Sequence, residues 1–405
     1  MTWLTALVAI PLAVSGIFGI MISLGAILAE LRPRTTPATI NPVPSVSVIV
    51  PAYNEGVVLA DCLDSILNSG YPNLELIVVN DGSTDDTAAV MEEFADRAIT
   101  ITKDNGGKGS ALNAGIERAS GEIYLFVDAD GIFTPDTIPN MLAGFRNKNV
   151  GAVCGNDQPV NTHNILTRIL TLMTHTGTGL ARRGLALLGM LPIVAGNSGA
   201  FRASAIRVVG GFREDTLGED LELTWRIQEA GYEVEFAADA IIFAEVPENL
   251  TALWKQRVRW TRGLLQTARL HRREFRTPAK SMFHVFLPVN FFAQVIQPLI
   301  QLASMAGLLG VIVLGLTRAS DWTAGLPSMW IVFGLGMSSV NIVLALILDR
   351  AWRNARHLVV LPFLLPFSLF LSCVAARAVW KEASGAEQTW NKLERTGLKT
   401  QTGAQ

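Results

Sequence analysis

The sequence predicts an α/β domain with a doubly wound sheet, joined to helices that cross a membrane. Two observations carry this prediction. Strand-like and helix-like segments alternate between residues 46 and 127, which is typical of a parallel sheet covered by helices on both faces. Half of the 405 residues are hydrophobic and only 17% are charged. The apolar residues are concentrated in uncharged stretches long enough to span a bilayer, namely 1–29, 285–317, 322–348 and 358–376.

The alternation begins with a β-branched run at residues 46–50, which Pro51 ends. Residues 57–67 have helical periodicity, and residues 74–79 form a second apolar run that ends at Asn80-Asp81-Gly82. The pattern then predicts helices over 84–94 and 110–119 and strands over 99–101 and 123–127. Ligands of such sheets bind beyond the carboxyl ends of the strands, so we look for the site there.

The chain is expected to divide into a transmembrane helix (1–30), a proline-rich linker (31–44), a cytoplasmic catalytic domain (45–275), an interfacial helix with about three spans (276–380) and a polar tail (381–405). The first stretch lacks a basic leader, which favours an uncleaved anchor over a signal peptide. Lysines and arginines crowd residues 255–280, which places the middle of the chain in the cytoplasm and the protein in the cell membrane as a multi-pass protein. Residues 163–191 are expected to be either a buried helix pair or helices on the membrane surface.

The net charge and the spacing of the cysteines limit the kinds of partner and site that the sequence predicts. The net charge of -2 gives no indication of nucleic acid, and no nucleic-acid partner is expected. The three cysteines have neither metal-ligand nor redox spacing. Membrane lipids are expected around the apolar stretches, and an accessory membrane subunit could complete the membrane part.

Three segments at the carboxyl edge of the sheet are candidate donor-binding elements. Asp81 opens a turn after a strand, where its carboxylate could bind a base or ribose; the alternative is ordinary turn chemistry. Ala52, Tyr53 and Glu55 follow the first strand, and Tyr53 could stack on a base. Lys108 lies in a glycine-rich loop that opens a helix, an arrangement that favours a diphosphate.

Asp128-Ala129-Asp130 follows an apolar strand, where core packing does not explain two carboxylates. Hard oxygen ligands suit Mg²⁺ or Mn²⁺, so the sequence predicts a divalent ion beside the donor's phosphates. Asp130 is the candidate for direct coordination, and Asp128 is the candidate for the ribose or the metal. A solvated acidic turn is the alternative.

Residues farther along the chain are candidates for the acceptor site. Glu219 and Asp220 begin a helix, where the dipole favours acidic residues for structural reasons alone. The functional interpretation makes Asp220 the general base and Glu219 its acidic neighbour. Asn197 and Ser198, in a stretch of small residues, could wall a sugar site or could belong to a closely packed strand end.

Gln256, Arg259 and Trp260 stand at i, i+3 and i+4 of a predicted helix and therefore share a face. Arg259 could bind a diphosphate, Gln256 could hydrogen-bond the acceptor, and Trp260 offers a flat surface to a sugar ring. The alternative is a basic helix that binds anionic lipid with its tryptophan at the interface.

In their order along the chain, Asp81, Asp128-Ala129-Asp130, Glu219-Asp220 and the segment 256–260 resemble the D, DxD, ED and QxxRW motifs of membrane-embedded processive glycosyltransferases of family 2. That group includes poly-β-1,6-N-acetylglucosamine, chitin-oligosaccharide, hyaluronan and cellulose synthases. The resemblance implies a GT-A fold, which is Rossmann-like and binds nucleotide-diphospho-sugars. It also implies a UDP-sugar donor, Mg²⁺ or Mn²⁺, inversion at the anomeric carbon, and a growing glycan as acceptor.

The sequence leaves two functions other than polymer synthesis open. The same motifs fit a non-processive transferase that modifies a lipid acceptor, and a non-enzymatic scaffold would be expected to have lost some carboxylates. Trp390 resembles a tryptophan of a gating segment in some relatives. If all three C-terminal stretches cross the membrane, however, residue 390 lies outside, so either one stretch is interfacial or this similarity is fortuitous.

Overall fold

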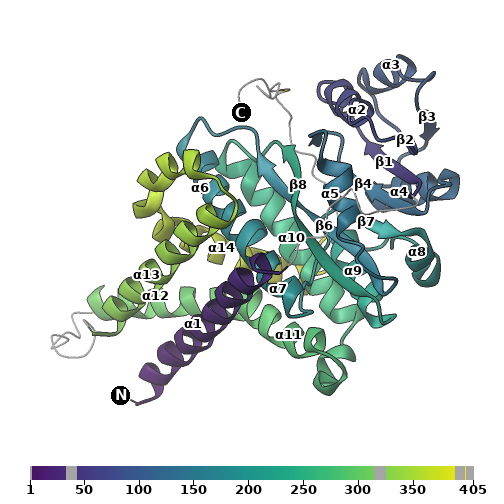
Figure 1. The fold of residues 1–405 in the computed structure, drawn as a ribbon. Coiled ribbons are helices and arrows are strands. Elements are labelled where there is room, and N and C mark those ends of the chain that lie inside the picture. The colour runs from purple at the N-terminus through teal and green to yellow at the C-terminus, as the bar shows by residue number, and fades with distance from the viewer. Residues whose placement is uncertain (1, 33–42, 314–324, 388–396, 398–405) are drawn as a thin grey trace.

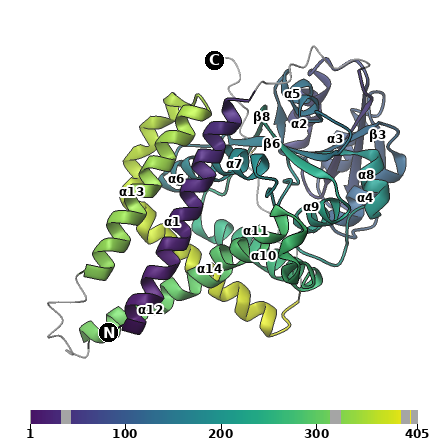
Figure 2. The same cartoon turned by 60° about the horizontal axis from the view of Figure 1, so that its bottom comes forward.

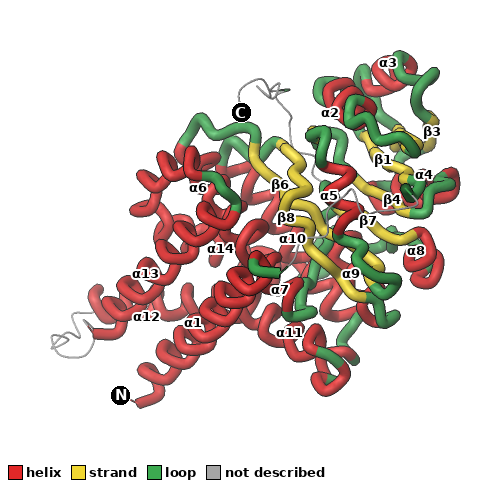
Figure 3. Tube along the Cα trace, in the orientation of Figure 1, coloured by secondary structure: helices red, strands yellow, loops and turns green. Residues whose placement is uncertain are grey.

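The computed structural model describes residues 2–32, 43–313, 325–387 and 397. Within them, eight strands form one mixed sheet in the order β3-β2-β1-β4-β7-β6-β8-β5 (Figure 3). The first four strands along the chain run parallel, and β7 is antiparallel to both β4 and β6. The strands are β1 (Val46–Ala52), β2 (Leu74–Asp81), β3 (Ile99–Lys103), β4 (Ile123–Phe126), β5 (Ile132–Phe133), β6 (Val150–Pro159), β7 (Gly199–Arg202) and β8 (Glu233–Ala244).

Helices cover both faces of the sheet, which confirms the doubly wound prediction for its first half. Val48 and Val50 of β1 pack against one helix layer, and Ile49 between them packs against the other. The first layer contains α2 (Leu59–Leu67), α3 (Thr87–Glu92) and α5 (Thr137–Ala143). The second contains α4 (Lys108–Arg118), α8 (Ala203–Val209) and α9 (Glu219–Glu229). The helix predicted over 84–94 is shorter than expected, because residues 82–86 form the turn after β2.

Residues 165–187 form one continuous helical segment rather than a helix pair. It consists of α6 (Ile165–Thr174), a π-helical part η2 (His175–Ala181) and α7 (Arg182–Leu187). Ile169, Leu170 and Leu172 are buried against apolar residues of the C-terminal helices. The segment is therefore buried between the α/β domain and the C-terminal helices, as the first alternative expected, but it is one helical segment and not a pair.

The remaining helices lie outside the two helix layers of the sheet. Three helices project away from the sheet (Figures 1 and 2). They are α1 (Thr2–Glu30), which projects with its N-terminal end, and α12 (Gln297–Val313) and α13 (Gly325–Leu348), which project with the ends next to the undescribed residues 314–324. Two helical stretches of the described residues, Met282–Ala306 and Trp352–Ala383, are long and apolar enough to cross a bilayer by length and composition. Other elements are α10 (Leu250–Leu270), η3 (Glu274–Arg276), η4 (Pro278–Lys280), α11 (Met282–Phe291), η5 (Phe292–Ile296), η6 (Trp352–Phe363) and α14 (Leu364–Ala383).

The last helix lies along α10 rather than extending away from the domain. The rings of Trp254 and Phe370 are 5.6 Å apart, and Arg262 forms an ion pair with Glu382 at 3.0 Å. Both ends of α14 therefore contact the helix that follows the α/β domain. Gly397 lies against Val57, at the start of the first helix layer, so the chain returns to the domain after α14. Trp390 lies outside the described residues.

Candidate active site

The predicted donor residues meet at the carboxyl edge of β1, β2 and β4, as the sheet order requires. Ala52, the last residue of β1, pairs with Asn80 beside Asp81, and β4 ends two residues before Asp128. Ala52 is buried and shapes this edge through its backbone, whereas Tyr53 and Glu55 are partly exposed just beyond it.

Asp81 is buried and holds the glycine-rich loop. Its Oδ1 accepts hydrogen bonds from Lys103 Nζ at 2.8 Å and from the Gly106 backbone N–H at 2.9 Å, and its Oδ2 accepts one from the Gly107 N–H at 2.8 Å. Gly107 has a φ of 87°, a conformation that glycine adopts without strain. The loop therefore enters α4 in a fixed position, with Lys108 as the first helical residue. A contact between Asp81 and a nucleotide stays a prediction.

Lys108 joins the donor motif to the acidic pair. Its ammonium contacts Asp128 Oδ1 and lies 3.6 Å from Glu219 Oε1. The Lys108 side chain is 13% exposed and that of Glu219 is 5% exposed, so a nearly buried cation is surrounded by carboxylates. Burial alone would lower the pKa of Lys108, but Asp128, Glu219 and Asp220 together raise it. Residues 111 positions apart are thus held in one ion cluster.

The two carboxylates of the acidic pair have different surroundings. Burial raises the pKa of Glu219 to about 7, although the charges of Lys108 and Arg259 oppose the shift. Asp220 is oriented by backbone donors: its Oδ2 accepts from the Gly196 N–H at 3.1 Å and its Oδ1 from the Leu221 N–H at 2.8 Å. A Cβ on Gly196 would lie 2.8 Å from Lys108 Nζ, so a larger residue there would displace the ammonium from the cluster.

The predicted metal residues fit a divalent ion only in part. Asp128 has a third of its side chain exposed, and Asp130 is nearly buried, with Oδ2 accepting a 3.2 Å hydrogen bond from the Glu245 N–H. No cluster of three or more His, Cys, Asp or Glu side chains suited to a metal occurs in the described part of the chain. Two carboxylates suit an ion that takes its other ligands from phosphates and water.

The loop at residues 195–198 separates two carboxylates. Asn197 Oδ1 accepts the Asp128 N–H at 3.3 Å, and its Nδ2 donates to Asp157 Oδ1 at 3.4 Å. Ser198 is fully buried, and its carbonyl accepts the Gly155 N–H at 2.7 Å, which agrees with the close-packing interpretation of this stretch. A contact between Ser198 and an acceptor stays a prediction.

The predicted helix over the QxxRW residues is present as α10. Arg259 is close enough to lower the pKa of Glu219, and it lines a cavity of about 50 Å³ with Lys255, Arg262 and Lys381. Trp260 is 46% exposed, and the Arg257 guanidinium lies 4.4 Å above its ring. Gln256 is partly exposed. Arg259 thus lies near the acidic pair, while the ring of Trp260 is partly exposed to solvent.

The contact between α9 and α10 was missed by sequence reasoning. A Cβ on Gly263 would lie 2.9 Å from the Gly218 Cα and N atoms, so the two backbones touch. Gln266 Oε1 accepts the Leu217 N–H at 2.9 Å, two residues before the start of α9. Arg259, Gly263 and Gln266 stand at i, i+4 and i+7, and this helical spacing was the signal available in the sequence.

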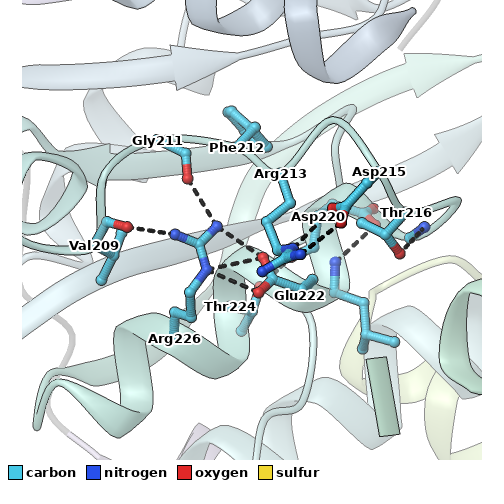
Figure 4. Close-up of polar contacts among 12 residues, drawn as sticks. Val209, Gly211, Phe212, Arg213, Asp215, Thr216, Asp220, Glu222, Thr224 and Arg226 are labelled. Atoms are coloured by element: carbon cyan, nitrogen blue, oxygen red, sulfur yellow. Dashed lines mark hydrogen bonds and ion pairs between the residues drawn. The ribbon is translucent and has the colours of Figure 1, made fainter. Parts of the chain in front are cut away.

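The opposite side of α9 is fixed by Arg226 (Figure 4). Its guanidinium donates to both oxygens of Glu222 at 2.9 Å, to the Val209 carbonyl at 2.5 Å and to the Gly211 carbonyl at 2.7 Å. Trp225 is fully buried and donates to the Pro192 carbonyl at 3.1 Å. The helix that begins with Glu219 and Asp220 is therefore held by contacts on several sides.

Comparison with known proteins gives three findings. Residues 47–210 match the family Glycosyl transferase family 2. The chain is 36% identical over 225 residues to the poly-beta-1,6-N-acetyl-D-glucosamine synthase of Staphylococcus epidermidis, covering 55% of each protein. It is 34% identical over 222 residues to the synthase of Staphylococcus aureus strain COL, covering 54% of each. The chain thus spans about half the length of the curated relatives it matches.

Among solved structures, the fold is similar to that of a mannosyltransferase from Pyrobaculum calidifontis, solved in complex with GDP-Man and Mn²⁺. The TM-score is 0.64 at 23% identity, over 86% of this chain and 99% of that one. The likeness confirms the predicted GT-A fold and extends beyond the α/β domain.

Proposed function

We propose that this chain, which carries a glycosyl transferase family 2 domain, transfers a sugar from a UDP-sugar to an acceptor hydroxyl at the membrane and inverts the anomeric configuration. The product we propose is a β-linked polysaccharide of the poly-N-acetylglucosamine type, as the names of the relatives suggest. The observation that carries the proposal is Lys108, which holds the donor motif at Asp128 against Glu219 and Asp220 in one cluster.

In the donor half of the reaction, Asp81, Tyr53 and Glu55 would hold the nucleoside at the edge of the sheet, with Ala52 shaping the site. Lys108 would face the diphosphate from the N-terminal end of α4, where backbone N–H groups also favour anions. Asp130 and Asp128 would hold Mg²⁺ or Mn²⁺, which supplies charge neutralisation for the departing diphosphate. The Pyrobaculum enzyme holds Mn²⁺ and a nucleotide-sugar in the same fold.

In the acceptor half, Asp220 would remove the proton of the attacking hydroxyl. Its carboxylate is aimed by the N–H groups of Gly196 and Leu221, which keeps it in position without competing for the proton. Glu219, the buried neighbour, would share the Lys108 charge and set the local field. Arg259, with Gln256, would bind the diphosphate and acceptor from α10, and Trp260 would support a sugar ring.

We also propose a membrane topology in which α1, the stretch from α11 to α12, and α13 cross the bilayer, while α14 lies at its cytoplasmic surface. The support is that α14 packs along α10 from Trp254 to Arg262 and that residue 397 returns to the α/β domain. Two spans instead of three in residues 276–380 place the catalytic domain and the C-terminal tail on the same side. Membrane lipids would surround the spans, and an accessory membrane subunit would complete the membrane part.

The test is to supply the purified protein in lipid with Mn²⁺ or Mg²⁺ and a panel of UDP-sugars, and to measure the length of the product. The proposal predicts a polymer from one donor. A product of one sugar on a lipid would replace the polymer by the glycolipid alternative, and no turnover of any donor would refute both.

A further inference from the structure

A buried pair of opposite charges, Asp157 at the end of β6 and Arg182 at the start of α7, lies beside the cluster that contains Asp220. Neither residue belongs to a motif of the sequence. Arg182 Nη1 lies 3.2 Å from Asp157 Oδ2 and also donates to the Gly155 carbonyl at 3.3 Å. Asp157 Oδ1 accepts a hydrogen bond from Asn197 Nδ2. The side-chain oxygen of Asn197, Oδ1, accepts the Asp128 N–H. Two hydrogen bonds therefore connect Asp157 to the donor motif.

The pair lies close to both halves of the site. Burial and the negative charge of Asp128 raise the pKa of Asp157. Burial opposes the raised pKa of Arg182, which Asp157 and Asp220 support, so each member of the pair is within electrostatic range of one half. The pair comes from β6 and α7, and in the sheet β7 and β6 lie beyond β4 from β1 and β2. The pair is therefore on the far side of β4 from the β1 and β2 end of the proposed nucleotide site.

Both side chains have hydrogen-bonding capacity to spare. Within the described residues, Arg182 donates hydrogen bonds only through Nη1. Its Nε and Nη2 atoms have no such bond and are not fully buried. These donors therefore reach the surface, where Arg182 is 13% and Asp157 is 22% exposed. A guanidinium and a carboxylate side by side offer both donors and acceptors, which hydroxyl groups of a sugar can pair with.

The same short helix connects the pair to the membrane part. A Cβ on Gly184 would overlap the carbonyl oxygen of Ile22 in α1, and Gly25 of α1 also lies against Gly184. Arg182 is two residues earlier on α7, so it lies where the catalytic domain meets the first membrane helix.

We propose that Asp157 and Arg182 form an acceptor subsite, which binds hydroxyl groups of the acceptor sugar and presents the attacking hydroxyl to Asp220. The inference rests on the proposed function and adds to it the residues that recognise the acceptor. The nucleotide-binding residues are separate from this subsite, so its loss should affect the acceptor alone.

The test compares Asp157→Asn and Arg182→Gln with the wild-type protein in lipid. The probes are UDP and β-1,6-linked N-acetylglucosamine oligomers. Each variant is expected to raise the KM for the oligomer about 10- to 100-fold, the usual range for losing a hydrogen bond to a charged group, while the Kd for UDP changes less than about twofold. The double variant should lose little more than either single variant, because the two residues act on one ligand.

Glu248→Gln is the matched control, since Glu248 is a partly exposed carboxylate bonded to an asparagine, Asn161, outside the site. It should leave both constants unchanged. An unchanged oligomer KM in both single variants would overturn the inference, as would equal losses of UDP affinity and transfer, which indicate a structural pair. Absence of turnover in the wild-type protein would instead refute the proposed function, so the two failures are distinguishable.

Discussion

Replacing Gly263 by Ala tests whether the contact between α9 and α10 sets the geometry of the site. Inside a helix, alanine is favoured over glycine by about 1 kcal/mol, so helix propensity alone predicts a more stable protein. The added Cβ would lie 2.9 Å from backbone atoms of Gly218, however, and ordinary contacts begin at 3.4 Å. The two backbones have to separate by about 0.5 Å, the tolerance of a catalytic arrangement.

The separation moves Glu219 and Asp220 relative to Arg259 and leaves β2 and β4 in place. Because displacements of about 1 Å cost roughly 100-fold in rate, we expect kcat to fall about tenfold with little change in UDP affinity. The assay is UDP release at saturating donor, with UDP binding measured on the same preparation. Gly177→Ala is the control, since a Cβ there meets nothing within 4 Å. A Gly263→Ala protein with wild-type kcat would show that this contact does not position the acidic pair.

Three other substitutions test the ion cluster and the C-terminal helix. The pKa of Glu219 is about 7 in the folded protein, above its unfolded value of 4.5, so its contribution to stability is fully present below pH 4.5 and is lost as pH rises from 4.5 to 7, by about 3 kcal/mol. Glu219→Gln should therefore flatten the fall in melting temperature between pH 4.5 and 7, and parallel curves would contradict this. Lys108→Met removes the ammonium that faces Asp128 and Glu219 and should cost about 3–5 kcal/mol, with a further rise in the pKa of Glu219; a melting temperature equal to that of Lys108→Arg would refute it. Glu382→Ala removes the partner of Arg262 and Gln266 and should speed proteolysis after residue 383, whereas unchanged cleavage would show that this pair does not hold the tail.

The first half of the sheet could be predicted because β1, β2 and β4 are continuous apolar runs bounded by turn residues. The second half could not. β6 carries Asn156 and Asp157 at its functional end, and β7 has only four residues, so neither gives a periodic signal. Composition likewise identified α14 as apolar enough to cross a membrane, but its position along α10 depends on side-chain pairs that are distant in sequence.

The candidate site, like the sheet, could be predicted from the sequence only in part. The order of the motifs predicted Asp81, Asp128 and Asp220 because each stands at the end of a strand or the start of a helix. The pairing of Lys108 with Glu219 depends on how the sheet and α9 pack together, which no local pattern encodes. Arg182 carries no local signal of a site, because its partner Asp157 lies across the fold.

The most direct test of the central claim is sugar transfer by Asp220→Asn, measured beside UDP binding to the same protein. Asparagine keeps the shape of the side chain and an oxygen for one backbone N–H group, but it cannot accept the proton of the acceptor. We expect transfer from the UDP-sugar to fall at least about 100-fold while UDP binds as in the wild-type protein. Transfer at the wild-type rate would contradict the assignment of Asp220 as the base.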